Sequence, residues 1–151
     1  MERATTIDEC LLEELDPVLI NNLREDARDD ERVISLAMAL MRSRSVEHRN
    51  EAVHIFLRLL SNPTLERRID VVYCLALTLY SLGDYETARI YCEELLREKP
   101  DMIQALHLHE AIVYKHAKKK QSKEFEKAGL ITIGVAASLV IAALTLGRRK
   151  K

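Results

Sequence analysis

Glycine and tryptophan are scarce in this chain of 151 residues. Four glycines occur, three of them after residue 128, so Gly83 is the one glycine among the first 127 residues, and there is no tryptophan. The sequence also lacks alternating β-branched runs bounded by turn residues, which are typical of strands. We therefore expect an all-α fold.

The N-terminal segment lacks the features of a cleaved leader. It begins MERATTIDECLLEELD, without a basic region followed by an apolar run, and its acidic residues argue against a mitochondrial presequence. Residues 1–31 carry eleven acidic and three basic side chains. We expect residues 1–15 to form an acidic N-terminal arm, and we expect the targeting information to lie elsewhere in the chain.

The chain lacks the excess of basic charge that is typical of nucleic-acid-binding proteins. The formal net charge is −1, and the absence of tryptophan leaves little material for stacking on bases. The cysteines Cys10, Cys74 and Cys92 are odd in number, widely spaced and form no CxxC pair. This pattern favours reduced, structural thiols in the cytosol over a disulfide framework.

Sequence patterns of catalysis and metal binding are absent as well. No phosphate-binding glycine loop, HExxH motif, nucleophile elbow or zinc spacing occurs. His107 and His109 are two residues apart, about 200° around a helix, so they cannot share a ligand face. We expect no enzymatic activity, no catalytic residue, no cofactor and no metal.

The C-terminal tail carries one long apolar run. Residues 128–147 contain no charge, nine of the twenty are Leu, Ile or Val, and twenty helical residues span about 30 Å, the thickness of a hydrocarbon core. We expect a single transmembrane helix here, because a domain of this size has no room to bury a helix that is apolar all round. A basic juxtamembrane linker at 121–127 and a basic end at 148–151 would flank it. The membrane-targeting residues we expect are Lys127, Arg148, Arg149, Lys150 and Lys151.

The expected span lies in the C-terminal tail, and this position predicts a tail anchor. Insertion would follow translation, which leaves the N-terminal domain facing the cytosol. Moderate hydrophobicity with a short basic end resembles tail anchors of the mitochondrial outer membrane and of peroxisomes. Small residues recur at Gly134, Ser138 and Ala142, a stripe that could pack two anchors into a homo-oligomer.

Six helices are predicted in residues 16–120. The first begins at Asp16 and Pro17, with Asp16 as the N-cap, and the others cover about 31–44, 47–60, 65–82, 84–99 and 101–120. Short connections favour an antiparallel six-helix bundle, which we expect to be the cytosolic domain.

Residue spacing indicates a tetratricopeptide-like helix-turn-helix repeat in the second half of this domain. Counting back from Pro100 places Ala76, Gly83, Tyr85 and Ala88 on the small, turn and aromatic sites of a 34-residue unit. A weaker copy upstream has Ala37 and Ala52 on the small sites. These are fifteen residues apart instead of twelve, and the turn between them lacks glycine. A bundle without repeats is the alternative.

The first helix of each repeat pair is expected to line a concave, partner-binding groove. By repeat position, the groove residues are Ile34, Met38, Met41, Arg42, Tyr73, Leu77 and Tyr80. Each of them could instead belong to the plain core. A carboxylate clamp for chaperone tails is not expected, because Ile34, Met38, Tyr73 and Leu77 stand where such clamps have Lys and Asn.

Several segments carry a family resemblance. "MALMRS" at 38–43, "DVVYCLALTLY" at 70–80, "DYETA" followed by "LL" and "KP", and "QALHL" at 104–108 resemble the mitochondrial fission 1 proteins. That resemblance implies an adaptor on the mitochondrial and peroxisomal surface, which recruits a dynamin-related GTPase or fission adaptor proteins. A tail-anchored import or quality-control receptor is the alternative. The arm could fold into the groove and compete with partners, or remain solvated.

Overall fold

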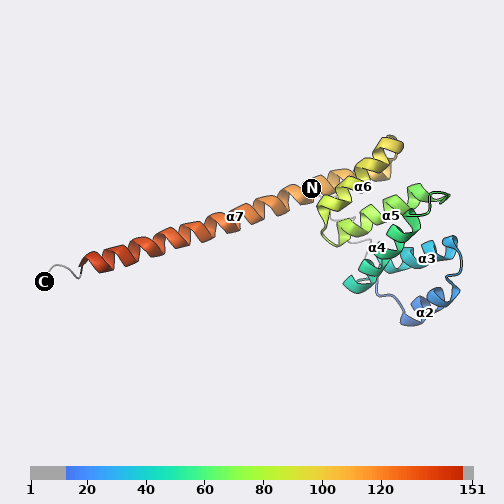
Figure 1. The fold of residues 1–151 in the computed structure, drawn as a ribbon, viewed down its shortest axis with the longest axis horizontal. Coiled ribbons are helices and arrows are strands. Elements are labelled where there is room, and N and C mark those ends of the chain that lie inside the picture. Colours follow the sequence, from blue (N-terminus) through green and yellow to red (C-terminus); the bar gives the residue numbers. More distant parts are fainter. Residues whose placement is uncertain (1–12, 148–151) are drawn as a thin grey trace. The chain divides into compact units, whose positions relative to one another are not determined.

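A computed structural model describes the backbone of residues 13–147 and the side chains of residues 13–127 (Figure 1). Predictions about residues 1–12 and 148–151, and about the side chains of the tail, lie outside the described residues. All six predicted helices are present, and the described backbone contains no strand, only one isolated bridge between Glu13 and Ser43. The helices are α2 (Pro17–Asp26), α3 (Asp30–Met41), α4 (Val46–Leu60), α5 (Arg68–Ser81), α6 (Tyr85–Glu98) and α7 (Ile103–Gly147).

Side-chain caps fix where four of these helices begin. The Asp16 carboxylate accepts a hydrogen bond from Val18 N at 2.9 Å, and Pro17 opens α2 as predicted. Asp29, Ser45 and Asp84 cap α3, α4 and α6 in the same way. Because the cap of α3 is Asp29, that helix begins at Asp30, one residue earlier than predicted.

Two helix ends lie three residues from their predicted boundaries. Helix α3 ends at Met41 instead of residue 44, because the backbone of residues 42–44 leaves the helix and pairs with Glu13. Helix α5 begins at Arg68 instead of residue 65. The preceding turn is held by Asn62, whose Oδ1 accepts hydrogen bonds from Thr64 N at 3.1 Å and from Thr64 Oγ1 at 2.8 Å.

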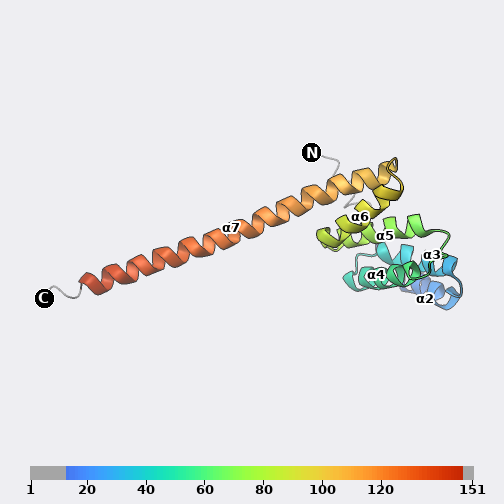
Figure 2. The same cartoon turned by 45° about the horizontal axis from the view of Figure 1, so that its top comes forward.

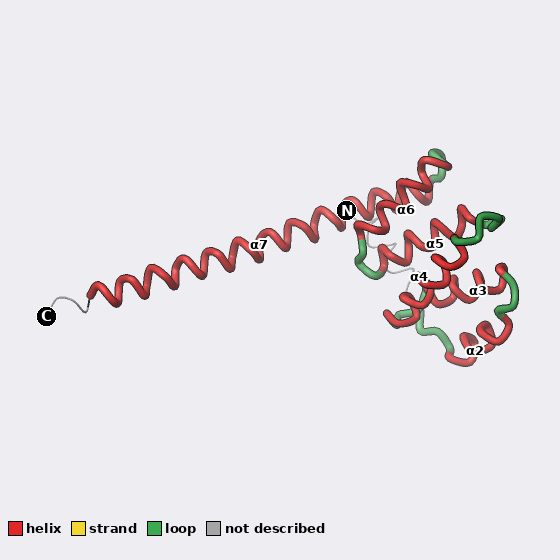
Figure 3. The backbone as a smooth tube through the Cα atoms, in the orientation of Figure 1, coloured by secondary structure: helices red, strands yellow, loops and turns green. Residues whose placement is uncertain are grey.

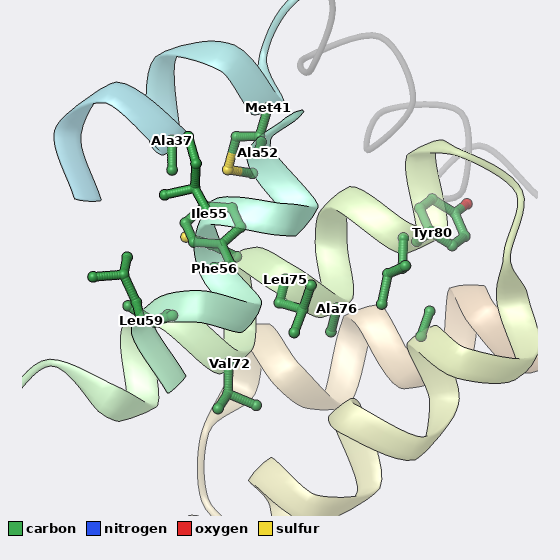
Figure 4. Packing of buried hydrophobic residues seen from close by; sticks show 14 of the residues in the cluster. Ala37, Met41, Ala52, Ile55, Phe56, Leu59, Val72, Leu75, Ala76 and Tyr80 are labelled. Carbon is green, nitrogen blue, oxygen red and sulfur yellow. The ribbon is translucent and has the colours of Figure 1, made fainter. Parts of the chain in front are cut away.

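Helices adjacent in the sequence pack against one another from α2 to α6, and α3 also contacts α5 (Figures 1 and 2). Short loops join α3 to α4 and α5 to α6 (Figure 3). Where these helices meet, the four alanines predicted on small repeat sites are fully buried, at 0% exposure: Ala37, Ala52, Ala76 and Ala88. Larger side chains, including Phe56 and Leu75, fill the space around the alanines (Figure 4). Small residues therefore permit close helix approach at the sites that the repeat spacing predicted.

The turn between α5 and α6 forms a Schellman motif. Gly83 has φ 78°, the left-handed conformation that glycine adopts without a Cβ penalty. Asp84 N donates to Leu79 O at 3.0 Å, and Gly83 N donates to Tyr80 O at 3.0 Å, so the last carbonyls of α5 are satisfied. The ring of Tyr85 lies 5.6 Å from that of Tyr80, centroid to centroid, while Pro100 lies exposed in the turn before α7.

Helix α7 continues without a break from Ile103 to Gly147. We predicted that this helix ends near residue 120, but residues 103–128 contain neither glycine nor proline, and lysine, glutamate, glutamine and alanine favour helix there. The boundary between two compact units falls between Tyr114 and Lys115. Among the residues whose side chains are described, no helix is long and apolar enough to span a membrane, and the predicted span at 128–147 falls outside that set.

Candidate partner-binding surface

Four of the predicted groove residues lie at least partly open to solvent on the first helices of the two pairs. Met38 on α3 is 37% exposed, and Arg42, the C-cap residue directly after α3, is exposed; on α5, Tyr73 and Leu77 are half-buried and one turn apart. Side chains four residues apart share a helix face. We call these four residues, Met38, Arg42, Tyr73 and Leu77, the first-helix set.

The other three predicted groove residues belong to the core. Ile34, Met41 and Tyr80 are 2%, 5% and 2% exposed. Figure 4 shows Met41 among the side chains that α3 and α4 bury, and Tyr80 on α5. For these residues the structure supports the core alternative that the sequence left open. Their contribution is to hold α3 and α5 in place under the first-helix set.

The first-helix set combines apolar, hydroxyl and cationic groups. Burial raises the pKa of the Tyr73 phenol. Like any tyrosine at physiological pH, this side chain is neutral and able to donate a hydrogen bond. Met38 is flexible and polarisable, which suits contact with partners of varied shape. Such a surface is chemically suited to an amphipathic segment with an apolar face and an acidic or carbonyl acceptor for Arg42.

The guanidinium of Arg42 is already engaged by the start of the described chain. Its Nη2 lies 2.6 Å from Glu13 Oε1, and Arg44 Nη1 lies 3.5 Å from Glu14 Oε1. The backbone is paired too, since Glu13 N donates to Arg42 O at 2.8 Å and Arg44 N donates to Glu13 O at 3.2 Å. The sequence alone did not predict this contact. The available signal was opposite charge: the arm is acidic, and the turn after α3 carries Arg42 and Arg44.

Arg49 is a second residue whose contact was not predicted from the sequence. It is 8% exposed, and its Nη1 donates to Ser81 O at 3.0 Å, which joins the first turn of α4 to the last turn of α5. Arg49 shares the buried face of α4 with Ala52 and Phe56, at spacings of three and seven residues. A basic residue on that apolar face was the available signal.

The thiols of Cys74 and Cys92 are free and buried, as expected for structural cysteines; Cys10 lies outside the described residues. Burial raises the pKa of each to about 11, and Cys92 Sγ donates to Ala105 O at 3.2 Å. Within residues 13–127, no three His, Cys, Asp or Glu side chains converge where they could hold a metal ion. Lys127 is exposed, and the other predicted targeting residues follow the described chain.

Known proteins resemble both the sequence and the fold. Residues 69–120 match the family profile of the Fis1 C-terminal tetratricopeptide repeat, which confirms the repeat predicted around Gly83. The chain is 36% identical over 100 residues to the mitochondrial fission 1 protein of Yarrowia lipolytica. This match covers 66% of the chain and 64%, a little under two thirds, of that relative.

A second relative is matched over more of its length. The mitochondrial fission 1 protein of Kluyveromyces lactis is 30% identical over 115 residues, which cover 76% of this chain and 71% of the relative. Among solved structures, yeast Fis1 in complex with an Mdv1 fragment superimposes with a TM-score of 0.68 at 22% identity, covering 75% of this chain and 94% of that one. At that identity the superposition supports the fold alone. Taken with the sequence matches, it leads to one conclusion: the chain belongs to the mitochondrial fission 1 protein family.

Proposed function

We propose that this chain is a tail-anchored adaptor that gathers fission partners on the mitochondrial surface. The observation that carries the proposal is the first-helix set, an apolar and cationic surface on the paired helices of a mitochondrial fission 1 family member. Such a surface binds other proteins, and it offers no reacting groups. The partners we propose are fission adaptor proteins, a dynamin-related GTPase, or both, and any nucleotide hydrolysis would come from them.

The related yeast protein supports a helical partner. Its solved complex contains an Mdv1 fragment with an N-terminal extension and coiled-coil domains. An amphipathic helix laid across α3 and α5 could bury its apolar side against Met38 and Leu77. Arg42 could then pair with an acidic residue of that helix. This mode of binding needs two or three apolar anchors at helical spacing in the partner.

The membrane part of the proposal concerns the tail. Residues 128–147 are uncharged and long enough to cross a bilayer as a helix, with basic residues on both sides. The proposed location is the mitochondrial outer membrane, with a share in the peroxisomal membrane and the helical domain facing the cytosol. A single span at the C-terminal end of the chain keeps the first-helix set within reach of cytosolic partners.

Organelle morphology tests this function. Overexpression should fragment mitochondria and peroxisomes, depletion should elongate them, and a chain without residues 128–151 should localise to the cytosol and do neither. Normal morphology with a defect in protein import would contradict the fission function and support an import or quality-control receptor instead.

A pair of substitutions tests the surface itself. Leu77→Glu in the first-helix set should abolish both fragmentation and partner capture. Leu57→Glu, a matched change at an exposed leucine of α4, should leave both intact. If the two variants behave alike, the first-helix set does not bind the partner. A thermal unfolding curve for each variant controls for loss of fold.

A further inference from the structure

Several serines of this chain stand three positions after a basic residue. Serine kinases whose substrate groove is acidic select this spacing, because the groove attracts the basic side chain. The sequence contains four such serines: Ser35, Ser45, Ser61 and Ser122. Ser122 has the strongest pattern, since three consecutive lysines occupy positions 118–120. The structure separates Ser122 from the other three.

The other three hydroxyls are engaged in helices of the folded domain. Ser45 caps α4, and its Oγ donates to Glu47 Oε2 at 2.6 Å. The hydroxyls of Ser35 and Ser61 donate to carbonyl oxygens of α3 and α4, at 2.9 Å and 2.6 Å. Ser122 is exposed, and its hydroxyl makes no hydrogen bond to any of residues 13–127. Its Oγ is therefore the one that is open to a reagent in the native structure.

The part of α7 around Ser122 buries no face. Every side chain of residues 117–127 is exposed, and these residues belong to the second of the two compact units. A helix without packing is stabilised by little more than its own backbone hydrogen bonds, so one or two turns open at small cost. A kinase binds the residues around its target serine as an extended segment. It can therefore reach Ser122 without unfolding the helical domain.

Positive charge is concentrated in the same part of α7. Residues 115–127, the lysine-rich segment, contain six lysines and two glutamates, and they directly precede the uncharged run at 128–147. Lysines beside a membrane span attract anionic lipid headgroups within about a Debye length. Ser122 lies four residues after Lys118 and three after Lys119, so the three side chains share a helix face. A phosphate on Ser122 would bring about two negative charges to that face.

We propose that Ser122 is a phosphorylation site of a kinase that selects basic residues, and that its phosphate releases the lysine-rich segment from anionic headgroups. The kinase transfers the γ-phosphoryl group of ATP. A bond forms between Ser122 Oγ and phosphorus, the bond from phosphorus to the leaving ADP breaks, and the hydroxyl proton passes to the catalytic aspartate of the kinase. The phosphate then pairs with Lys118 in place of a headgroup. The inference rests on the proposed function in that the segment adjoins the proposed membrane span.

Phosphate incorporation tests the site. The full chain in lipid nanodiscs is treated with ATP and the catalytic subunit of cyclic-AMP-dependent protein kinase, and mass spectrometry locates the phosphate. Ser122 should be modified at least about tenfold faster than Ser35 or Ser61, because a kinase reaches those two only by opening packed helices. Ser122→Ala should remove the main product. Equal rates at the three serines, or no phosphate on Ser122, would overturn the proposal.

Amide hydrogen exchange tests the release. Peptides that cover residues 115–127 should exchange at least about threefold more slowly in nanodiscs that contain phosphatidylserine than in nanodiscs of phosphatidylcholine alone. Phosphorylation of Ser122 should abolish this difference, and removal of the phosphate by a phosphatase should restore it. Ser61→Glu adds a negative charge at an exposed serine of the helical domain, so it is the matched control and should leave the difference unchanged.

Two outcomes of the exchange experiment would overturn the proposal. One is equal exchange in the two lipids before phosphorylation, which would mean that the lysine-rich segment is simply solvated. The other is a phosphorylated chain that still exchanges slowly beside phosphatidylserine. These measurements use purified components and need no organelle, so failure here and failure of the morphology experiment are separate results.

Discussion

The two helix pairs of this domain close their turns in different ways. Between α5 and α6, Gly83 adopts a left-handed conformation, and the backbone N–H groups of Gly83 and Asp84 satisfy the last carbonyls of α5. Between α3 and α4, no glycine is available, and Ser43, Ser45 and the arm residue Glu13 hold the turn with side chains and a bridge.

The difference shows that one repeat turn is self-contained and the other depends on a distant segment. A backbone turn built on glycine needs few particular neighbours. A turn held by serine hydroxyls and by an isolated bridge depends on Glu13, a residue thirty positions away in the sequence. Arg49, which donates from α4 to Ser81 O, connects the two turns.

The largest expected effect tests whether the two pairs unfold together. Phe56→Ala removes a fully buried side chain of the first pair and should destabilise the domain by about 3–5 kcal/mol. Denaturant unfolding of the full chain in detergent should show one transition, because α4 and α5 pack directly. Leu57→Ala, at the exposed neighbouring residue, should change little. Two separate transitions would mean that the helix pairs are independent units.

Removing the hydrogen bond that connects the two turns should cause the next largest loss of stability. Arg49→Met keeps much of the side-chain volume but removes the charged hydrogen bond to Ser81 O, for an expected loss of about 1.5–3 kcal/mol. Arg58→Met, at an exposed position of the same helix, is the control and should fall within about 0.5 kcal/mol of the parent. An equal effect of both substitutions would show that the buried hydrogen bond does not couple the turns.

The glycine turn can be tested by residue type. Gly83→Ala places a Cβ in a left-handed conformation and should cost about 1–2 kcal/mol in thermal unfolding experiments. Gly83→Asn should cost less, because asparagine tolerates this conformation better. If alanine and asparagine cost the same, the φ value of 78° is not what stabilises the turn.

The smallest expected effect concerns the serine turn. Ser45→Ala removes the cap that accepts from His48 N at 3.3 Å and should cost about 1 kcal/mol, whereas Ser45→Asp, which can also cap, should be nearly neutral. The same chemical denaturation assay can resolve this difference. A larger loss of stability from Ser45→Ala than from Gly83→Ala would contradict this order of effects. It would mean that the Ser45 cap stabilises the domain more than the left-handed glycine does.

Features set by local chemistry were predictable from the sequence. Asp16 and Pro17 marked the start of α2, Gly83 marked the turn of the second pair, and the spacing of Ala76 and Ala88 located a helix crossing. Each depends on residues within one repeat of each other, so the pattern of a single segment carries the information.

Features that depend on contacts across the chain were not predictable. The pairing of Glu13 with Ser43 joins residues thirty positions apart, and it ends α3 earlier than helix propensity suggests. Periodicity also could not separate Ile34 and Met41 from Met38, because it gives the faces of a helix but not which face a neighbour covers. Arg49 was missed for the same reason: its acceptor, Ser81 O, belongs to another helix.

The buried thiols of Cys74 and Cys92 make this chain convenient for site-specific labelling. The thiolate is the species that alkylating reagents attack, and burial, which raises the pKa of both thiols to about 11, keeps them protonated at neutral pH. The two core cysteines should therefore contribute little background when a dye is attached to Cys10, three residues before Glu13. The natural sequence thus supplies one cysteine, Cys10, at which a dye can be attached without first removing the two core thiols.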